Sequence, residues 1–245
     1  MKISVFCKEC SFETPSKYYL LNVQDTQDYE IKCDHGHITY FVNGCSKYET
    51  LFEIACNAII DGYHREAISS FSSSLERFYE LFIKSSLYEK GHTKDEVDAF
   101  WSPISNQSER QLGAFVSVYT LTTGSTADIL TTNQSSFRNS VIHKGKITDY
   151  AKTVEYGQRI SDIIKNALLA AKKHFPAGVL TFFIHENGSH SRPFGKCYGG
   201  TTPSLLCPVD IMNYPVVPLE EWLSDLKYLR NRAIERANPN IENAK

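Results

Sequence analysis

The feature that most constrains the fold is a long amphipathic pattern over residues 65–89. Apolar side chains recur there at three- and four-residue steps, which is the spacing of one face of an α-helix. They are Ile68, Phe71, Leu75, Phe78, Tyr79, Phe82 and Ile83. Lys90 and Gly91 follow, a basic residue and a glycine of the kind that ends helices. At 1.5 Å per residue this helix is roughly 37 Å long, so it is long enough to organise a helical bundle.

Helical spacing continues on both sides of this segment. The further helices that it predicts cover residues 48–61, 94–100, 108–121 and 149–175. A short helix is expected to end at Lys144-Gly145, with Ser135 or Ser136 as its N-cap. Pro176 and Gly178 are expected to end the bundle. The pattern therefore predicts a mainly α protein in which residues 48–178 form one helical bundle.

The two ends of the chain have other patterns. Short β-like runs at 3–6, 29–32 and 38–42 alternate with polar connections, so residues 1–47 are expected to form a small β domain. Residues 179–245 form a short mixed α/β extension in this interpretation. Its run VLTFFIHE, at 179–186, predicts a buried strand, and residues 219–237 predict an amphipathic helix.

Cysteine and histidine cluster near the N-terminus. Cys7 and Cys10 form a CxxC pair, and the sequence Cys33-Asp-His35-Gly36-His37 follows after 22 intervening residues. Thiolate and imidazole donors from two tight turns suit a tetrahedral zinc ion, and the apolar flanks resemble those of a zinc ribbon. The predicted ligands are Cys7, Cys10, Cys33 and His37, with His35 as the alternative to His37. The protein fills all four positions, so the zinc would be structural and no catalytic metal is expected.

Other uses of the cysteines are weaker. A thioredoxin-like redox pair would need a βαβ pattern around it, which the sequence lacks, whereas unliganded thiols remain an alternative. A second metal site built from His185, His190, Cys197 and Cys207 would match no familiar spacing. Metal binding is favoured over unliganded thiols because residues 1–47 include few large apolar residues. A segment of this size needs the free energy of metal binding to fold.

The segment FRNSVIHKG carries the candidate chemistry. Asn139 and His143 stand four residues apart, on one face of the short helix, and the long side chain of Arg138 can reach the same pocket. An imidazole can accept the proton of a ribose 2′-hydroxyl or donate one to a leaving 5′-oxygen. A guanidinium can stabilise the charge that grows on a phosphate. These parts suit cleavage of RNA without a metal, in a site that two subunits would complete.

An arginine, a polar residue and a histidine after a short gap, ahead of a long helix, resemble the signature of HEPN (higher eukaryotes and prokaryotes nucleotide-binding) domains. The resemblance covers residues 48–175. It implies a helical bundle, homodimerisation and metal-independent endoribonuclease activity, with Arg138 and His143 as the catalytic pair and Asn139 as the polar residue. It also implies a role as a toxin or an antiphage effector, with an antitoxin or regulatory protein as partner.

Four charged residues are secondary candidates. Glu76 and Glu80, one turn apart on the long helix, would either orient Arg138 or His143 or form an exposed carboxylate face. Lys144 and Lys146 would either attract RNA or be ordinary solvated lysines.

Charge and hydropathy limit the other function classes. A net charge of −2 and a pI near 6.4 disfavour a zinc-dependent DNA-binding regulator, because such proteins carry a strong positive field. The chain shows neither a signal-peptide pattern nor a membrane span, so a cytoplasmic protein with no membrane partner is expected. The alternative to the nuclease is a non-catalytic module that binds RNA, a nucleotide or a partner protein.

Overall fold

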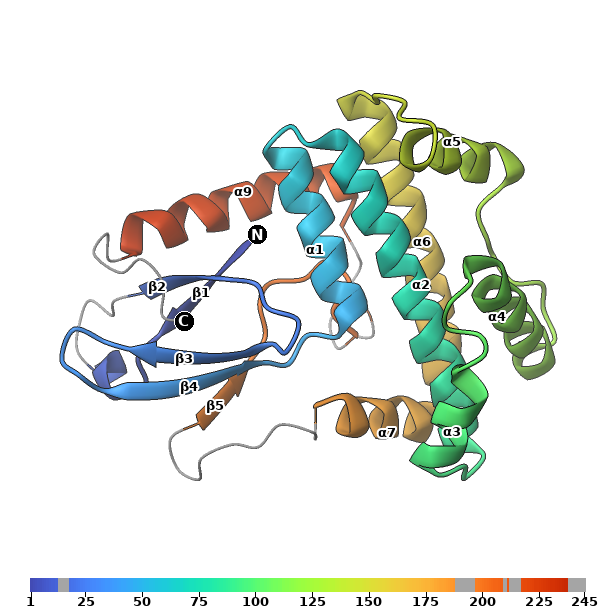
Figure 1. Ribbon diagram of the computed structural model, residues 1–245, viewed down its shortest axis with the longest axis horizontal. Coiled ribbons are helices and arrows are strands. Elements are labelled where there is room, and N and C mark those ends of the chain that lie inside the picture. The colour runs from blue at the N-terminus through green and yellow to red at the C-terminus, as the bar shows by residue number, and fades with distance from the viewer. Residues whose placement is uncertain (13–17, 188–196, 209–210, 212–216, 238–245) are drawn as a thin grey trace. The chain divides into compact units, whose positions relative to one another are not determined.

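The computed structural model describes residues 1–12, 18–187, 197–208, 211 and 217–237 (Figure 1). The chain is mainly helical with a small N-terminal sheet, which confirms the predicted fold class at this level. It divides into two compact units. The strand unit contains the described residues of 1–45, 189–203 and 222–245, and the helical unit contains those of 46–188 and 204–221. The expected C-terminal extension is thus shared between the two units.

The helical unit is built around α2 (His64–Glu89), as the amphipathic pattern predicts. This helix contacts α1 (Lys47–Ile60), α3 (Lys94–Trp101), α4 (Ser108–Thr123), α5 (Thr132–Ile142), α6 (Tyr150–His174) and α7 (Pro176–Asn187). The predicted apolar face of α2 is buried along its length. Figure 1 shows α2 and α6 as the two long helices of this unit.

The start of α5 differs from the prediction. Thr131, rather than Ser135 or Ser136, is the N-cap, because its hydroxyl accepts from the Gln134 N–H and the Gln134 side chain accepts from the Thr131 N–H. This reciprocal pair is a capping box, which satisfies two backbone donors at once. The helix therefore begins earlier than predicted. Asp149 caps α6 where the sequence indicates.

The strand predicted at residues 179–186 is wrong, since these residues belong to α7. Pro176 does not end the bundle: it is the first residue of α7, where proline is favoured because no intrahelical donor is lost. Among the described helices none is by itself long and apolar enough to cross a membrane, and only α6 with α7, bent by 110°, reaches that length and composition jointly.

Gly178 sets the close approach of α7 to α2. A Cβ at this position would lie 1.9 Å from the Ser85 carbonyl oxygen and 2.9 Å from the Glu89 nitrogen, both backbone atoms. We expect Gly178→Ala to lower the free energy of unfolding by about 3 kcal/mol, because α7 must move away from α2. Gly113, exposed inside α4 with nothing within 4 Å of an added Cβ, gives the control.

For Gly113→Ala we expect a gain of up to about 1 kcal/mol, since alanine is the better helix former. Urea unfolding of both variants measures the two changes. Equal stability of the two alanine variants would contradict the packing of α7 on α2.

The strand unit holds two small sheets. Strands β1 (Lys2–Phe6) and β2 (Tyr18–Asn22) are antiparallel, as are β3 (Asp28–Lys32) and β4 (Ile38–Asn43), and β5 (Cys197–Gly200) is parallel to β4. The sequence predicts β1, β3 and β4 but neither β2 nor β5. The buried core contains Ile3, Val5, Tyr19, Tyr29, Ile31 and Phe41, together with Cys7 and Cys33. From Trp222 onward, α9 (Leu219–Arg236) belongs to this unit.

Candidate functional site

Four metal-donor side chains converge in the strand unit. Cys7 directly follows β1, Cys10 lies in a single 3-10 turn, Cys33 directly follows β3, and His37 directly precedes β4. One donor atom from each residue lies within 4.8 Å of all the others. The structure thus brings together the ligand set that the cysteine spacing predicts.

The distances within this cluster fit a tetrahedral ion. With Zn–S bonds of about 2.3 Å and Zn–N bonds of about 2.0 Å, two sulfurs are roughly 3.8 Å apart and a sulfur and a nitrogen roughly 3.5 Å apart. The Sγ of Cys10 lies 3.8 Å from the Sγ of Cys33 and 3.3 Å from the Nδ1 of His37. The Sγ of Cys7 lies 4.0 Å from the same nitrogen. The four donors are therefore compatible with a structural zinc site.

Hydrogen bonds around the cluster hold the ligands. The Cys33 N–H donates to the His37 carbonyl at 3.0 Å and the Gly36 N–H donates to the Cys33 carbonyl at 2.9 Å, which closes the second turn. Gly36 has a φ of +82°, a left-handed conformation that glycine adopts without steric cost. The Nε2 of His37 lies 3.7 Å from a carboxylate oxygen of Glu9, an arrangement that commonly orients metal-bound histidine.

Two thiols of this cluster, those of Cys10 and Cys7, have opposite pKa shifts. Burial and the neighbouring Cys33 and Cys7 sulfurs raise the pKa of Cys10 to about 12. Burial also acts to raise the pKa of Cys7, but hydrogen bonds from the Thr39 hydroxyl and from the backbone outweigh it and lower that pKa to about 7. Crowded thiols of this kind resist losing their protons together, and a divalent cation between them removes that repulsion.

His35 is the alternative fourth ligand. Its Nδ1 also lies 3.3 Å from the Cys10 Sγ, but the ring is exposed and outside the set of donors that are mutually close. The second cluster considered from sequence involves His190, which lies outside the described residues, and Cys197, whose side chain does as well.

The second candidate site lies in the helical unit, where α5 faces α2. The Nη2 of Arg138 donates to Oε1 of Glu76 at 3.1 Å, and its Nη1 donates to the Asn139 side-chain oxygen at 3.1 Å. Ser108, the first residue of α4, donates to the same Glu76 oxygen at 2.7 Å. Three helices thereby fix the direction of one guanidinium.

A pocket surrounds this guanidinium. Its polar lining includes Ser72, Glu76, Ser108, Glu109, Ser135, Arg138, Asn139 and Tyr156. The Ser72 hydroxyl lies 3.0 Å from the Tyr156 hydroxyl, and burial raises the pKa of Tyr156, so this phenol stays protonated. The pocket therefore offers a cation, an amide and several hydroxyls, beside the two carboxylates of Glu76 and Glu109, so an anionic ligand would be bound through Arg138.

His143 lies at the end of the same helix but not in the pocket. It is the C-cap of α5, its backbone N–H donates to the Asn139 carbonyl at 3.0 Å, and its side chain is exposed. The Nη2 of Arg65 contacts the carbonyl of Ile142, 3.5 Å away. Lys144 and Lys146 are exposed on the following turn. The structure thus joins Arg138, Asn139 and Glu76 and leaves the imidazole facing outward.

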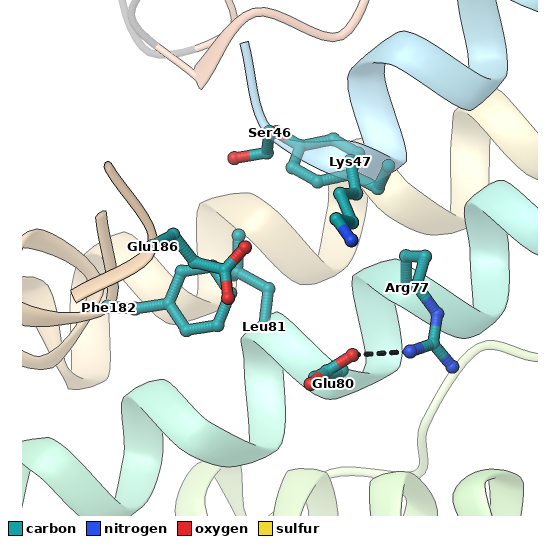
Figure 2. Close-up of a pocket in the computed structure, with 8 residues that line it drawn as sticks. Ser46, Lys47, Arg77, Glu80, Leu81, Phe182 and Glu186 are labelled. Carbon is teal, nitrogen blue, oxygen red and sulfur yellow. Dashed lines mark hydrogen bonds and ion pairs between the residues drawn. The ribbon is translucent and has the colours of Figure 1, made fainter. Parts of the chain in front are cut away.

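Glu80 belongs to a different pocket (Figure 2). Its Oε2 accepts from Nη1 of Arg77 at 2.6 Å and its Oε1 lies 2.9 Å from Nζ of Lys84. Figure 2 shows Glu80 beside Arg77, with Lys47 and Glu186 lining the same pocket. Of the two carboxylates considered from sequence, Glu76 therefore contacts Arg138 and Glu80 contacts other cations.

Sequence reasoning missed several residues of the Arg138 pocket. Ser72, Ser108 and Tyr156 come from three helices and carry no spacing signal relative to one another. Arg159 was missed as well: from α6 it donates to the Asp128 carboxylate at 2.9 Å and to the Ile129 carbonyl at 2.6 Å, just before α5. Asp128 and Arg159 are 31 positions apart in sequence, and an acidic residue and an arginine at such a separation show no pattern that identifies them as an ion pair.

Comparisons with known proteins add no assignment to either site. No protein-family model, no curated protein and no solved structure matches the chain.

Proposed function

We propose that the helical unit is a metal-independent endoribonuclease of the HEPN type. The observation that carries the proposal is the anchoring of Arg138 by Glu76 and Asn139, one turn before the exposed His143. A guanidinium with five donors keeps several for a phosphate after these two contacts. An exposed imidazole at the same helix end is accessible to an RNA strand.

The proposed reaction uses the RNA's own 2′-hydroxyl. Its oxygen attacks the adjacent phosphorus while the bond from phosphorus to the 5′-oxygen breaks. A neutral imidazole takes the 2′-hydroxyl proton, and an imidazolium gives a proton to the leaving 5′-oxygen. The guanidinium of Arg138 stabilises the charge on the non-bridging oxygens. The products are a 2′,3′-cyclic phosphate and a free 5′-hydroxyl.

A homodimer would supply both proton-transfer groups. One chain offers a single histidine in this motif, whereas the reaction uses a base and an acid on opposite sides of the phosphorus. Two copies related by a two-fold axis would face their α5 ends toward one RNA strand. The outward direction of His143 supports this arrangement, because an imidazole outside its own pocket is free to act in a shared one.

We propose zinc as the ion of the Cys7, Cys10, Cys33 and His37 cluster, with a structural role. Three sulfur donors and one nitrogen donor select zinc over magnesium or calcium, and all four positions are protein ligands. A toxin or antiphage effector of this design would act on cellular RNA and would be held inactive by an antitoxin or regulatory protein.

The test is cleavage of total tRNA, rRNA and mRNA by the purified chain in EDTA. We expect fragments that end in a 2′,3′-cyclic phosphate, detected as ends that a kinase with 3′-phosphatase activity converts to 3′-hydroxyls. If RNA of all three classes stays uncut at micromolar protein concentration, the proposal is wrong. Expression tests the same point, because an active nuclease is toxic and an Arg138 variant is not.

Glu76 should act as a positioning residue for Arg138. We expect Glu76→Gln to lower kcat for RNA cleavage about 10- to 100-fold with little change in KM, because small displacements of a positioned group are costly. The partly exposed ion pair contributes little stability, so the free energy of unfolding should change by less than about 1 kcal/mol.

Glu80→Gln is the matched control for Glu76→Gln. It removes the same charge from the same helix, one turn away, but its partners are Arg77 and Lys84. Its kcat should equal that of the natural chain. Equal losses in the two variants would mean that charge on α2, rather than the contact with Arg138, controls the rate.

A non-catalytic binding module is the second candidate. The observation that favours it is that the carboxylate of Glu76 already neutralises Arg138, in a pocket that His143 does not line. Such a module would bind RNA or a nucleotide through the pocket without cleaving it. Tight binding together with intact RNA ends would select this function.

A further inference from the structure

One face of the β1–β2 hairpin is not part of the core. Side chains alternate along each strand, so Ile3, Val5 and Tyr19 turn to the buried core. Ser4 and Tyr18 lie on the opposite face and are only half buried. Phe6 pairs with Tyr18 across the two strands, and their rings meet edge to face with centroids 6.1 Å apart.

Helix α9 closes this face into a groove within the strand unit. The groove is lined by Ser4, Tyr18, Tyr228, Leu229, Arg232 and Arg236, together with Ala233. A backbone bridge between Tyr18 and Ala237 ties the end of α9 to β2. The groove thus has one wall from a sheet and one from a helix, and it lies outside the Cys7 cluster and outside the helical unit.

The groove is positively charged although the chain is not. The second half of α9, residues 227–236, carries four basic side chains and a single carboxylate, that of Glu235. No carboxylate of the described residues lines the groove. Arg232 and Arg236 therefore provide a local positive field that attracts phosphates. Because the net charge of the chain is −2, any contact with nucleic acid requires a local field of this kind.

Two of the lining residues already contact each other. The guanidinium carbon of Arg232 lies 5.8 Å from the centroid of the Tyr228 ring, and its Nη1 donates to the Tyr228 hydroxyl at 2.9 Å. The Tyr228 side chain is otherwise open, because the residue is 59% exposed. Unpaired bases stack on aromatic rings and on guanidinium planes of this kind.

We propose that this groove binds single-stranded nucleic acid. Bases would stack on Tyr228, Arg232 and Tyr18, and the phosphates would lie along Arg232 and Arg236. Tyrosine faces read only unpaired bases, so a duplex is excluded from this mode. An acidic peptide would use the arginines but would leave the two tyrosines without a role. The site goes beyond the proposed nuclease and does not depend on its activity.

Binding is measured by fluorescence anisotropy with the full chain carrying His143→Ala, so that RNA stays intact whether or not the nuclease proposal holds. The probes are labelled 12-mers of oligo(U) and oligo(dT), each titrated at several salt concentrations. We expect binding of one or both, and a preference between them reports whether the sugar is read. Metal content and thermal unfolding of each variant show that the strand unit is folded.

Variants separate stacking from charge. Tyr228→Ala should weaken binding about 5- to 100-fold, the range for one stacked base, whereas Tyr228→Phe should bind like its parent because it keeps the ring. Arg232→Ala with Arg236→Ala should reduce the slope of log K against log salt by about 1.4, or roughly 0.7 for each phosphate contact. Lys90→Ala with Lys173→Ala removes the same charge from exposed positions of the helical unit and should leave the slope unchanged.

Three outcomes would overturn the proposal. The first is the absence of binding of both oligomers at 50 mM salt or below. The second is an equal loss in the Lys90 and Lys173 control, which would mean that net charge alone attracts the strand. The third is competition by polyglutamate at the same charge concentration with no effect of Tyr228→Ala, which would assign the groove to acidic peptides.

Discussion

We expect His143→Ala to lower the rate of RNA cleavage on the order of 10²- to 10⁴-fold, the usual contribution of a positioned acid or base. The reason is that His143 is the only histidine in the sequence of α5 and the turn that follows it, and the same helix carries Arg138. Because its side chain is exposed, the free energy of unfolding should be unaffected within about 0.5 kcal/mol. Single-turnover cleavage of a labelled RNA in EDTA gives the rate.

His92→Ala is the matched control, since His92 is another exposed histidine next to a helix end, and its partner is Glu96. It should cleave at the natural rate. Mixing the Arg138→Ala and His143→Ala chains tests the shared site, because a mixed dimer keeps one intact copy of each group. Activity above that of either variant alone supports the dimer, and a purely monomeric chain in ultracentrifugation contradicts it.

We expect His37→Ala to lose the bound metal and to unfold β1–β4, whereas His35→Ala should keep close to one equivalent of zinc. The buried core of the strand unit is small, so under the proposed zinc site most of its folding free energy would come from the ion, for which structural sites supply about 10–16 kcal/mol. Metal analysis gives the stoichiometry, and hydrogen exchange at Ile3 and Ile31 reports the folding of the strands.

The paired histidines make this test specific. Both Nδ1 atoms lie 3.3 Å from the Cys10 Sγ, so the two variants remove the same group at the same distance from one sulfur. Loss of zinc only in His35→Ala would reassign the fourth ligand. Less than about half an equivalent of zinc in the natural chain would remove the metal assignment altogether.

Local patterns made most of the helical unit predictable. The spacing of Phe71, Phe78 and Phe82 depends on one helix only, and those side chains are buried as expected. The run at 179–186 failed because a short apolar segment is equally compatible with a strand or a buried helix. The packing of this segment as a helix depends on Gly178, which lets α7 approach the backbone of α2. That contact joins segments far apart in sequence, so it produces no periodic pattern in the sequence.

The two candidate sites also differ in how far local sequence patterns predict them. The Cys7 to His37 cluster comes from two tight turns, so the spacing predicted that these donors meet, but it left His35 open as the alternative to His37. The surroundings of Arg138 come from α2, α4, α5 and α6, and the sequence could not distinguish Glu76 from Glu80. Both carboxylates point from neighbouring turns of one helix, and only the packing of α5 decides which of them receives the guanidinium.

The pairing of β5 with β4 has a consequence for how the chain is made. Roughly 150 residues separate the two strands, and at about 5–20 residues per second the synthesis of this intervening segment takes about 8–30 s. All four candidate metal ligands leave the ribosome during this interval, before β5 and α9 exist. An ion bound by the nascent chain would fold β1–β4 before β5 and α9 are synthesised and pack against them. The metal supply during translation would therefore decide what fraction of the protein reaches the native fold.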